Sequence, residues 1–128
     1  MTPKPKAPSS QIRPRPDAII EQVYRGNQTA ETVSEGIAAL RQVLTQAGGK
    51  AKPARILLDL TNLGKTSAEA RAAGARGIRT VPIARVAMYG TNLYNQVMVN
   101  LIFQASGKAR RFRAFNTKAK AIAWLKKG

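Results

Sequence analysis

The amino-acid sequence predicts a single small α/β domain, and three observations lead to this prediction. The chain has 128 residues, of which 44% are hydrophobic, so it suits one compact domain with one core. Between Arg55 and Trp124, apolar runs of strand length alternate with capped amphipathic helices. The run Ile56–Leu60 leads directly into a polar turn over Thr61–Ser67, which predicts a polar loop beyond the carboxyl end of a strand.

The first strand and helix lie between residues 18 and 49. We predict a strand over Ala18–Tyr24 that ends at the turn pair Gly26-Asn27. Thr29 is placed to cap the following helix, and Gly48-Gly49 to end it. The apolar side chains of this helix fall on one face at spacings of four, three and four: Val33, Ile37, Leu40 and Leu44.

The second strand, Arg55–Leu60, is apolar on both faces except at its ends, a pattern typical of a central buried strand. After the polar turn, Thr66 and Glu69 form a Thr-x-x-Glu capping box, which predicts a helix that runs to about Arg76. The body of this helix is rich in alanine, so we expect it to pack close to the sheet.

The third strand is predicted over Arg85–Tyr89, after Pro82. Thr91 or Asn92 is expected to cap the next helix, and Ser106-Gly107 to end it. The residues expected on the core side of that helix are Leu93, Val97, Leu101 and Ile102.

The last strand, Arg110–Phe115, alternates Phe112 and Ala114 with two arginines, which predicts an amphipathic edge strand. Asn116-Thr117 is expected to cap the final helix. This helix is predicted to bury Ala119, Ile122, Ala123 and Leu125, with Trp124 over the edge of the sheet.

Residues 1–16 are predicted to form a mobile basic tail, and residues 17–128 the folded domain. The tail holds five of the seven prolines and four basic residues, with too few apolar residues to offset the entropy of ordering. Because of its prolines, Gln11–Pro16 is expected to be a poor partner for a neighbouring strand.

The net charge of +16 is unevenly distributed along the chain. All six carboxylates lie before residue 70, whereas Ala70–Gly128 holds twelve Lys or Arg residues and no acid. This half should attract polyanions such as nucleic acid, an anionic membrane surface or an acidic protein. The alternative is a basic surface that serves only solubility.

The chain contains no cysteine and no histidine, which excludes disulfides, thiolate and imidazole metal sites, and Cys or His nucleophiles. We therefore expect no enzyme activity, no cofactor and no metal. The amino terminus lacks the apolar stretch of a secretion signal, and no run approaches the roughly 20 apolar residues that a membrane span needs. The expected location is the cytoplasm.

Four stretches of the sequence are Leu57–Leu63, Tyr89–Asn92, Phe112–Asn116 and Ala121–Leu125. Together they resemble the STAS-like domains that are related to anti-sigma-factor antagonists. The resemblance implies a four- to five-stranded mixed sheet with helices packed on it, and a non-enzymatic regulatory or protein-interaction module. It also implies a phosphorylatable Ser or Thr at the start of the helix after the second strand, where the matching stretch of this chain is Lys65-Thr66-Ser67-Ala68. The antagonist branch reads Asp-Ser-Ser-Gly across that turn, whereas this chain has Thr66-Ser67-Ala68-Glu69.

Two strand-to-helix turns supply the candidate docking face. Their small polar groups and helix starts can bind a protein partner or an anion, or they can simply be caps. Gly64-Lys65-Thr66 matches the second half of a phosphate-binding loop, but Asp59 stands where that motif requires glycine. The candidate residues are Thr61, Asn62, Leu63, Lys65, Thr66, Ser67, Gly90, Thr91 and Asn92, with Tyr89 and Asn95 as further lining of a shallow pocket.

A basic patch is the second candidate site. On the last strand and helix, it could follow a phosphate backbone or an acidic partner, or it could be a solvated edge that resists aggregation. It would support the alternative function, a polyanion-binding protein that acts through its C-terminal half and N-terminal tail on nucleic acid or an anionic membrane. The patch consists of Arg110, Arg111, Arg113, Lys118 and Lys120.

Overall fold

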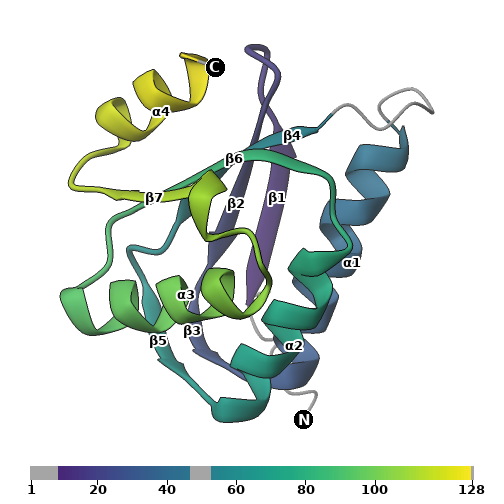
Figure 1. Cartoon of the computed structure of the whole chain (residues 1–128), viewed down its shortest axis with the longest axis vertical. Helices are drawn as coiled ribbons and strands as arrows, with labels where there is room; N and C mark the ends of the chain where they lie inside the picture. The colour runs from purple at the N-terminus through teal and green to yellow at the C-terminus, as the bar shows by residue number, and fades with distance from the viewer. Residues whose placement is uncertain (1–8, 47–52, 128) are drawn as a thin grey trace, which may run out of the picture.

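The computed structural model describes residues 9–46 and 53–127, and a five-stranded mixed sheet forms its centre (Figure 1). The first pair of strands is antiparallel and the other neighbours are parallel, so the predicted α/β class and mixed sheet are confirmed. In spatial order the strands are β1 (Ser10–Pro14), β2 (Ile19–Tyr24), β4 (Ala54–Asp59), β6 (Ile83–Tyr89) and β7 (Phe112–Phe115).

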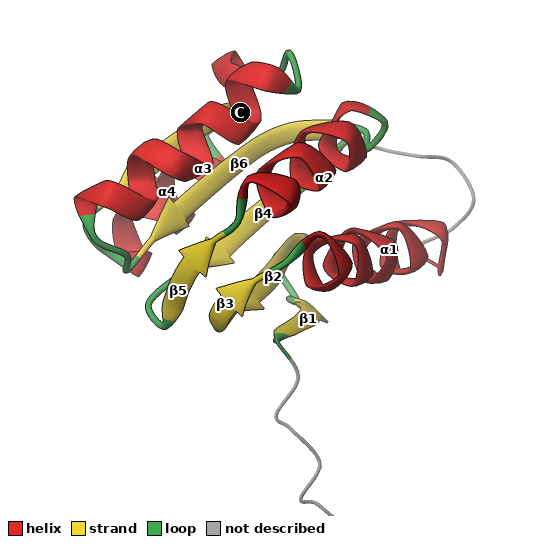
Figure 2. Cartoon of the chain, turned by 90° about the horizontal axis from the view of Figure 1, so that it is seen from below, coloured by secondary structure: helices red, strands yellow, loops and turns green. Residues whose placement is uncertain are grey.

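Helices cover both faces of this sheet. Because side chains alternate along a strand, Ile56 and Leu58 of β4 enter the larger core, and Leu57 enters a smaller core on the opposite face. Figure 1 shows the last helix apart from the other three, and Figure 2 shows the first two helices side by side. The helices of the larger core are α1 (Ala30–Gln46), α2 (Ala68–Arg79) and α3 (Leu93–Ala105), and that of the smaller core is α4 (Lys118–Lys126).

Short patterns in the sequence predicted most of these elements. The second predicted strand is the central one, β4, as its apolar faces require. Thr29, Asn92 and Thr117 each accept a hydrogen bond from the backbone N–H three residues further on, at 3.2, 2.8 and 3.2 Å. These predicted caps are therefore confirmed. Of the predicted α1 face, Val33, Ile37 and Leu40 are buried and Leu44 is half-buried, whereas the predicted stop at Gly48-Gly49 lies outside the described residues.

The amino-terminal strand was not expected, and it is present. β1 runs antiparallel to β2, from the pair Ser10 and Tyr24 to the pair Pro14 and Ile20. Pro14 is the last residue of an edge strand, a position where proline is tolerated. The predicted tail boundary at residue 16 is therefore wrong, and residues 1–8 lie outside the described part of the chain.

The polar turn after β4 contains a strand. β5 (Leu63–Thr66) pairs in parallel with β3 (Gly26–Gln28) and forms a second, two-stranded sheet. Because Thr66 belongs to β5, the predicted capping box is wrong. Ser67 caps α2 instead, since its Oγ accepts a hydrogen bond from the Ala70 backbone N–H at 3.1 Å.

The predicted core face of α3 is also wrong. Of the four residues expected inside, Ile102 is buried, whereas the exposed fractions of Leu93, Val97 and Leu101 are 74%, 48% and 45%. Apolar side chains occur on nearly every side of this helix, so periodicity alone does not define its buried face. The buried residues are Asn95, Val99, Ile102 and Phe103.

The carboxyl-terminal elements differ from the prediction in detail. A short 3-10 turn, η1 (Ala109–Arg111), precedes β7, so the edge strand begins at Phe112. α4 buries Ala121 and Leu125 completely, whereas the predicted Ala119 and Ala123 are exposed. The helix is rich in alanine on all sides, so its small side chains did not mark which side faces the sheet.

Candidate functional site

The two polar turns lie side by side at the carboxyl ends of β4 and β6. The Leu60 backbone N–H donates to the Tyr89 carbonyl at 3.1 Å, and Gly90 packs directly on Thr61. Gly90 has a φ of +94°, and a Cβ at this position would overlap the Thr61 hydroxyl. The two turns are therefore in direct contact at Thr61 and Gly90.

Asn95 links the two turns through side-chain hydrogen bonds. Its side chain is buried, and its Nδ2 donates to the Leu63 carbonyl at 3.3 Å and to the Thr91 hydroxyl at 3.0 Å. Its backbone N–H donates to Asn92 Oδ1 at 2.8 Å, which caps α3. Asn95 was expected to line a shallow pocket, but its amide is used to join the start of α3 to β5.

The polar side chains of the first turn have structural partners. The Thr61 hydroxyl donates to Asp59 Oδ1 at 2.6 Å. Burial alone would raise the pKa of Asp59, but hydrogen bonds from Thr61 and Tyr89 outweigh it and lower that pKa below its usual range. Ser67 occupies the position where the family resemblance places a phosphorylatable residue, and its hydroxyl is the cap of α2.

The half-matched phosphate loop is not a loop in the structure. Gly64, Lys65 and Thr66 belong to strand β5, and the Lys65 backbone N–H donates to Asn27 Oδ1 at 2.9 Å. The Thr66 carbonyl accepts a hydrogen bond from Arg71 at 2.7 Å. These backbone groups are committed to the fold, so the segment does not form the cradle that a nucleotide phosphate requires.

An exposed apolar surface continues from these turns along α3. Leu93, Val97 and Leu101 follow each other at intervals of four residues, and Tyr94, with 64% of its surface exposed, stands beside them. We call these four residues the α3 stripe. Contiguous exposed apolar surface on a small domain marks an interaction site more often than isolated exposed residues do.

The residues of the predicted basic patch belong to η1, β7 and α4. Arg110 and Arg111 lie in η1, which contacts α3, and Arg111 donates to the Ile83 carbonyl at 3.0 Å. The register places Arg113 in one row with Ala87, on the face of the sheet that α4 covers. Lys118 and Lys120 belong to α4. Arg113 therefore shares a face of the sheet with α4, which carries Lys118 and Lys120, and a polyanion-binding role of the patch stays a prediction.

Glu21 is a buried carboxylate that the sequence analysis did not single out, and it forms ion pairs with three basic side chains. The Glu21 side chain is 7% exposed and lies 3.2 Å from Lys118 Nζ, 3.7 Å from Arg15 and 3.9 Å from Arg13. This cluster joins β1, β2 and the start of α4. Part of the positive charge therefore stabilises the fold itself. These residues are far apart in the sequence, so their contact could be predicted only if the strand order were known.

Two further arginines donate hydrogen bonds to backbone carbonyls at the carboxyl end of α4. Arg55 donates to the Leu125 carbonyl, and Arg85 donates to the Trp124 carbonyl at 2.7 Å. The Arg85 guanidinium also lies over the Trp124 ring, 4.7 Å from its centroid. Cations at the carboxyl terminus of a helix satisfy its last carbonyls and its dipole.

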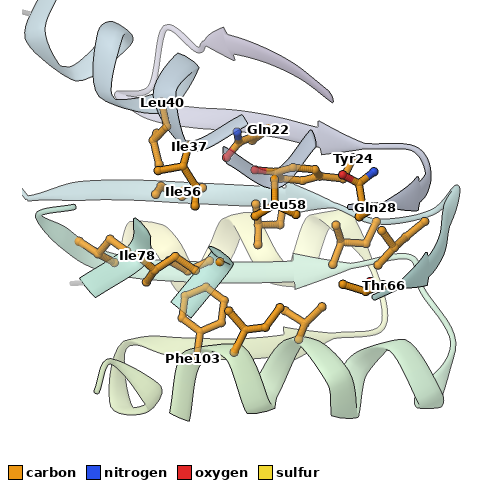
Figure 3. Close-up of a pocket in the computed structure, with 18 residues that line it drawn as sticks. Gln22, Tyr24, Gln28, Ile37, Leu40, Ile56, Leu58, Thr66, Ile78 and Phe103 are labelled. Carbon is orange, nitrogen blue, oxygen red and sulfur yellow. The ribbon is translucent and has the colours of Figure 1, made fainter. Parts of the chain in front are cut away.

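An apolar cavity of about 90 Å³ lies between the sheet and the first three helices (Figure 3). Its lining includes Gln22 and Gln28, but Gln22 Nε2 donates to the Gly36 carbonyl at 2.8 Å and Gln28 Nε2 to the Arg25 carbonyl at 2.9 Å. Among the described residues, no buried side-chain nitrogen or oxygen lacks a hydrogen-bond partner. The two glutamine amides are therefore engaged within the fold, and the lining also includes the hydroxyl-bearing side chains of Tyr24 and Thr66.

Within residues 9–46 and 53–127, no group of three or more acidic, Cys or His side chains is arranged to hold a metal ion. No helix in them is both long and apolar enough to span a bilayer.

Comparison with known proteins places the chain in a family. The model of a domain of unknown function, DUF7793, matches residues 17–128. The chain belongs to this family. No curated protein matches the sequence.

The fold is shared with a solved structure. An uncharacterized protein of the DUF3478 family from Shewanella loihica, described as having a SpoIIAA-like fold, is 22% identical to this chain. The alignment covers 97% of this chain and 99% of the other, with a TM-score of 0.67. The DUF7793 chain thus has the STAS fold related to anti-sigma-factor antagonists, and the predicted STAS-like resemblance is confirmed at the level of the fold.

Proposed function

We propose that this protein is a non-enzymatic regulatory module that binds another protein through the α3 stripe and the two adjoining turns. The observation that carries the proposal is the stripe itself, four large apolar side chains that stay exposed beside the candidate docking residues. Burial of such side chains is the main source of binding energy at protein interfaces.

The contacts that fix α3 on the domain favour binding through a preformed surface. Phe103, on the buried side of α3, stacks on Phe112 of β7 with ring centroids 4.3 Å apart. At the other end of the helix, Asn92 caps the first turn and Asn95 joins it to β5. A preformed surface loses little conformational entropy when a partner docks.

The polar groups of the turns favour docking over catalysis. The Asp59 carboxylate accepts hydrogen bonds from Thr61, and its pKa is lowered, so at neutral pH it is a charged acceptor instead of a proton donor. The Ser67 hydroxyl is engaged as the cap of α2. These groups support the shape of the turns, where a partner can contact their exposed edges.

The test is capture of a partner from the native host by the purified chain, followed by binding measurements with that partner in pure form. We expect Val97→Asp to weaken its affinity at least about ten-fold, because a charge would be buried in the interface. Ala38→Asp is the matched control, since Ala38 is an exposed position of α1. Equal affinities of the wild type and Val97→Asp for the purified partner would refute the docking face.

A further inference from the structure

We propose that the segment bound by the α3 stripe is an acidic amphipathic helix of the partner protein. This inference rests on the proposed function and specifies the chemistry of the partner. Two properties of the surface lead to it, the geometry of the stripe and the charge around it.

The geometry favours a helix as the bound element. Leu93, Val97 and Leu101 form one row of residues four apart, which is the ridge that packs against the grooves of a second helix. The row extends over about 12 Å, slightly more than two helical turns. Because the backbone groups of α3 are bonded within the helix, this surface cannot bind a partner by strand addition, which needs an open sheet edge.

The charge favours an acidic partner. α3 has no charged residue, but cations gather at its carboxyl end, where Arg79 donates to the Ala105 carbonyl at 3.1 Å and η1 contributes Arg110 and Arg111. No carboxylate occurs after Glu69 in the sequence. A partner helix with carboxylates against this end would meet complementary charge, which speeds association and selects partners.

The same charge disfavours two other occupants. A second copy of this chain would bring a net charge of +16 against an equal one. Helices that lie on anionic membranes carry Lys and Arg along their own polar face, and α3 carries none. An acidic protein helix is therefore the occupant that fits both the apolar row and its cationic end.

The experiment is selection of a displayed library of random 16-residue peptides on the purified chain, in parallel with Val97→Asp, Arg110→Glu and Ala38→Asp. We expect enrichment of peptides with apolar residues at helical spacing and with Glu or Asp near one end. Binding of a selected peptide should weaken at least about ten-fold in Val97→Asp and several-fold in Arg110→Glu, and it should decrease as salt increases. The Ala38→Asp variant should bind as the wild type does.

The alternative outcomes separate this inference from the proposed function. Peptides that depend on Val97 but are neutral, basic or extended would overturn the acidic helix and leave the docking face in place. Peptides that bind Val97→Asp as well as the wild type would overturn both. A further measurement is flotation of the chain with vesicles of phosphatidylcholine and phosphatidylglycerol. If this flotation depends on Val97 and no selected peptide does, the stripe binds a membrane and the acidic helix is overturned.

Discussion

Truncation of Leu125 to alanine tests how α4 is held on the sheet. Leu125 is fully buried, in a small core with Ile19, Leu57, Ala87 and Ala121. Leu→Ala substitutions at buried sites cost about 2–5 kcal/mol, through lost transfer energy and the cavity that remains. α4 has nine residues and can shift to fill part of that cavity, so we expect a loss of about 2–3 kcal/mol.

The assay and its control follow from the same region. Trp124, the single tryptophan, lies on α4 with its ring centroid 5.6 Å from that of Phe115, so its fluorescence reports urea unfolding of this face directly. Leu93→Ala is the matched control, because Leu93 is 74% exposed and its truncation should change the free energy of unfolding by less than about 0.5 kcal/mol. Equal losses from the two substitutions would refute the packing of α4 against this small core.

Three further predictions concern the turns. Gly90→Ala should destabilise the fold by about 1–3 kcal/mol in urea unfolding, because alanine is strained at positive φ and its Cβ would overlap Thr61; an unchanged midpoint would contradict this contact. Ser67→Ala should cost about 1 kcal/mol by the same measurement, because it removes the cap of α2, and Ser67→Thr should retain most of the stability. Because the pKa of Asp59 is lowered in the folded state, its contribution to stability is present above the unfolded pKa of about 4 and is lost as the pH falls through the folded value. Melting temperatures of the wild type should therefore fall more steeply below about pH 4 than those of Asp59→Asn, and parallel curves would argue against the Asp59 hydrogen bonds.

The elements that sequence reasoning predicted are those with signals in their own residues. β4 is apolar on both faces between Arg55 and Asp59, and Thr29, Asn92 and Thr117 are polar residues at the start of helical patterns. Such signals depend on a few neighbouring residues, so no knowledge of the tertiary structure is needed to read them. The adjacent placement of the two turns also followed, because the carboxyl ends of parallel strands meet at one edge of a sheet.

The elements that sequence reasoning missed depend on distant partners. β1 contains Pro14 and becomes a strand only because β2 offers it an antiparallel edge. The buried side of α3 is decided by the neighbouring helix and by Phe112, since the helix is apolar nearly all round. That one error matters for function, because three side chains assigned to the core belong to the exposed stripe.

The basic charge shows the same dependence on distant partners. Arg55 and Arg85 stand at neighbouring positions of β4 and β6, and both bind carbonyls at the end of α4, far along the chain. Lys118 was assigned to a basic patch, but it lies 3.2 Å from Glu21. The polyanion-binding alternative stays a prediction, and a titration with duplex DNA at low salt would test it, because charge-driven binding must weaken as salt increases.

Hydrogen–deuterium exchange on the chain with and without its purified partner tests the docking face most directly. We expect slower exchange in α3 and in the turn that contains Gly90 when the partner is bound, with no change in α4. Protection of α4 or β1 with unchanged exchange across α3 would contradict the assignment of the α3 stripe as the docking surface.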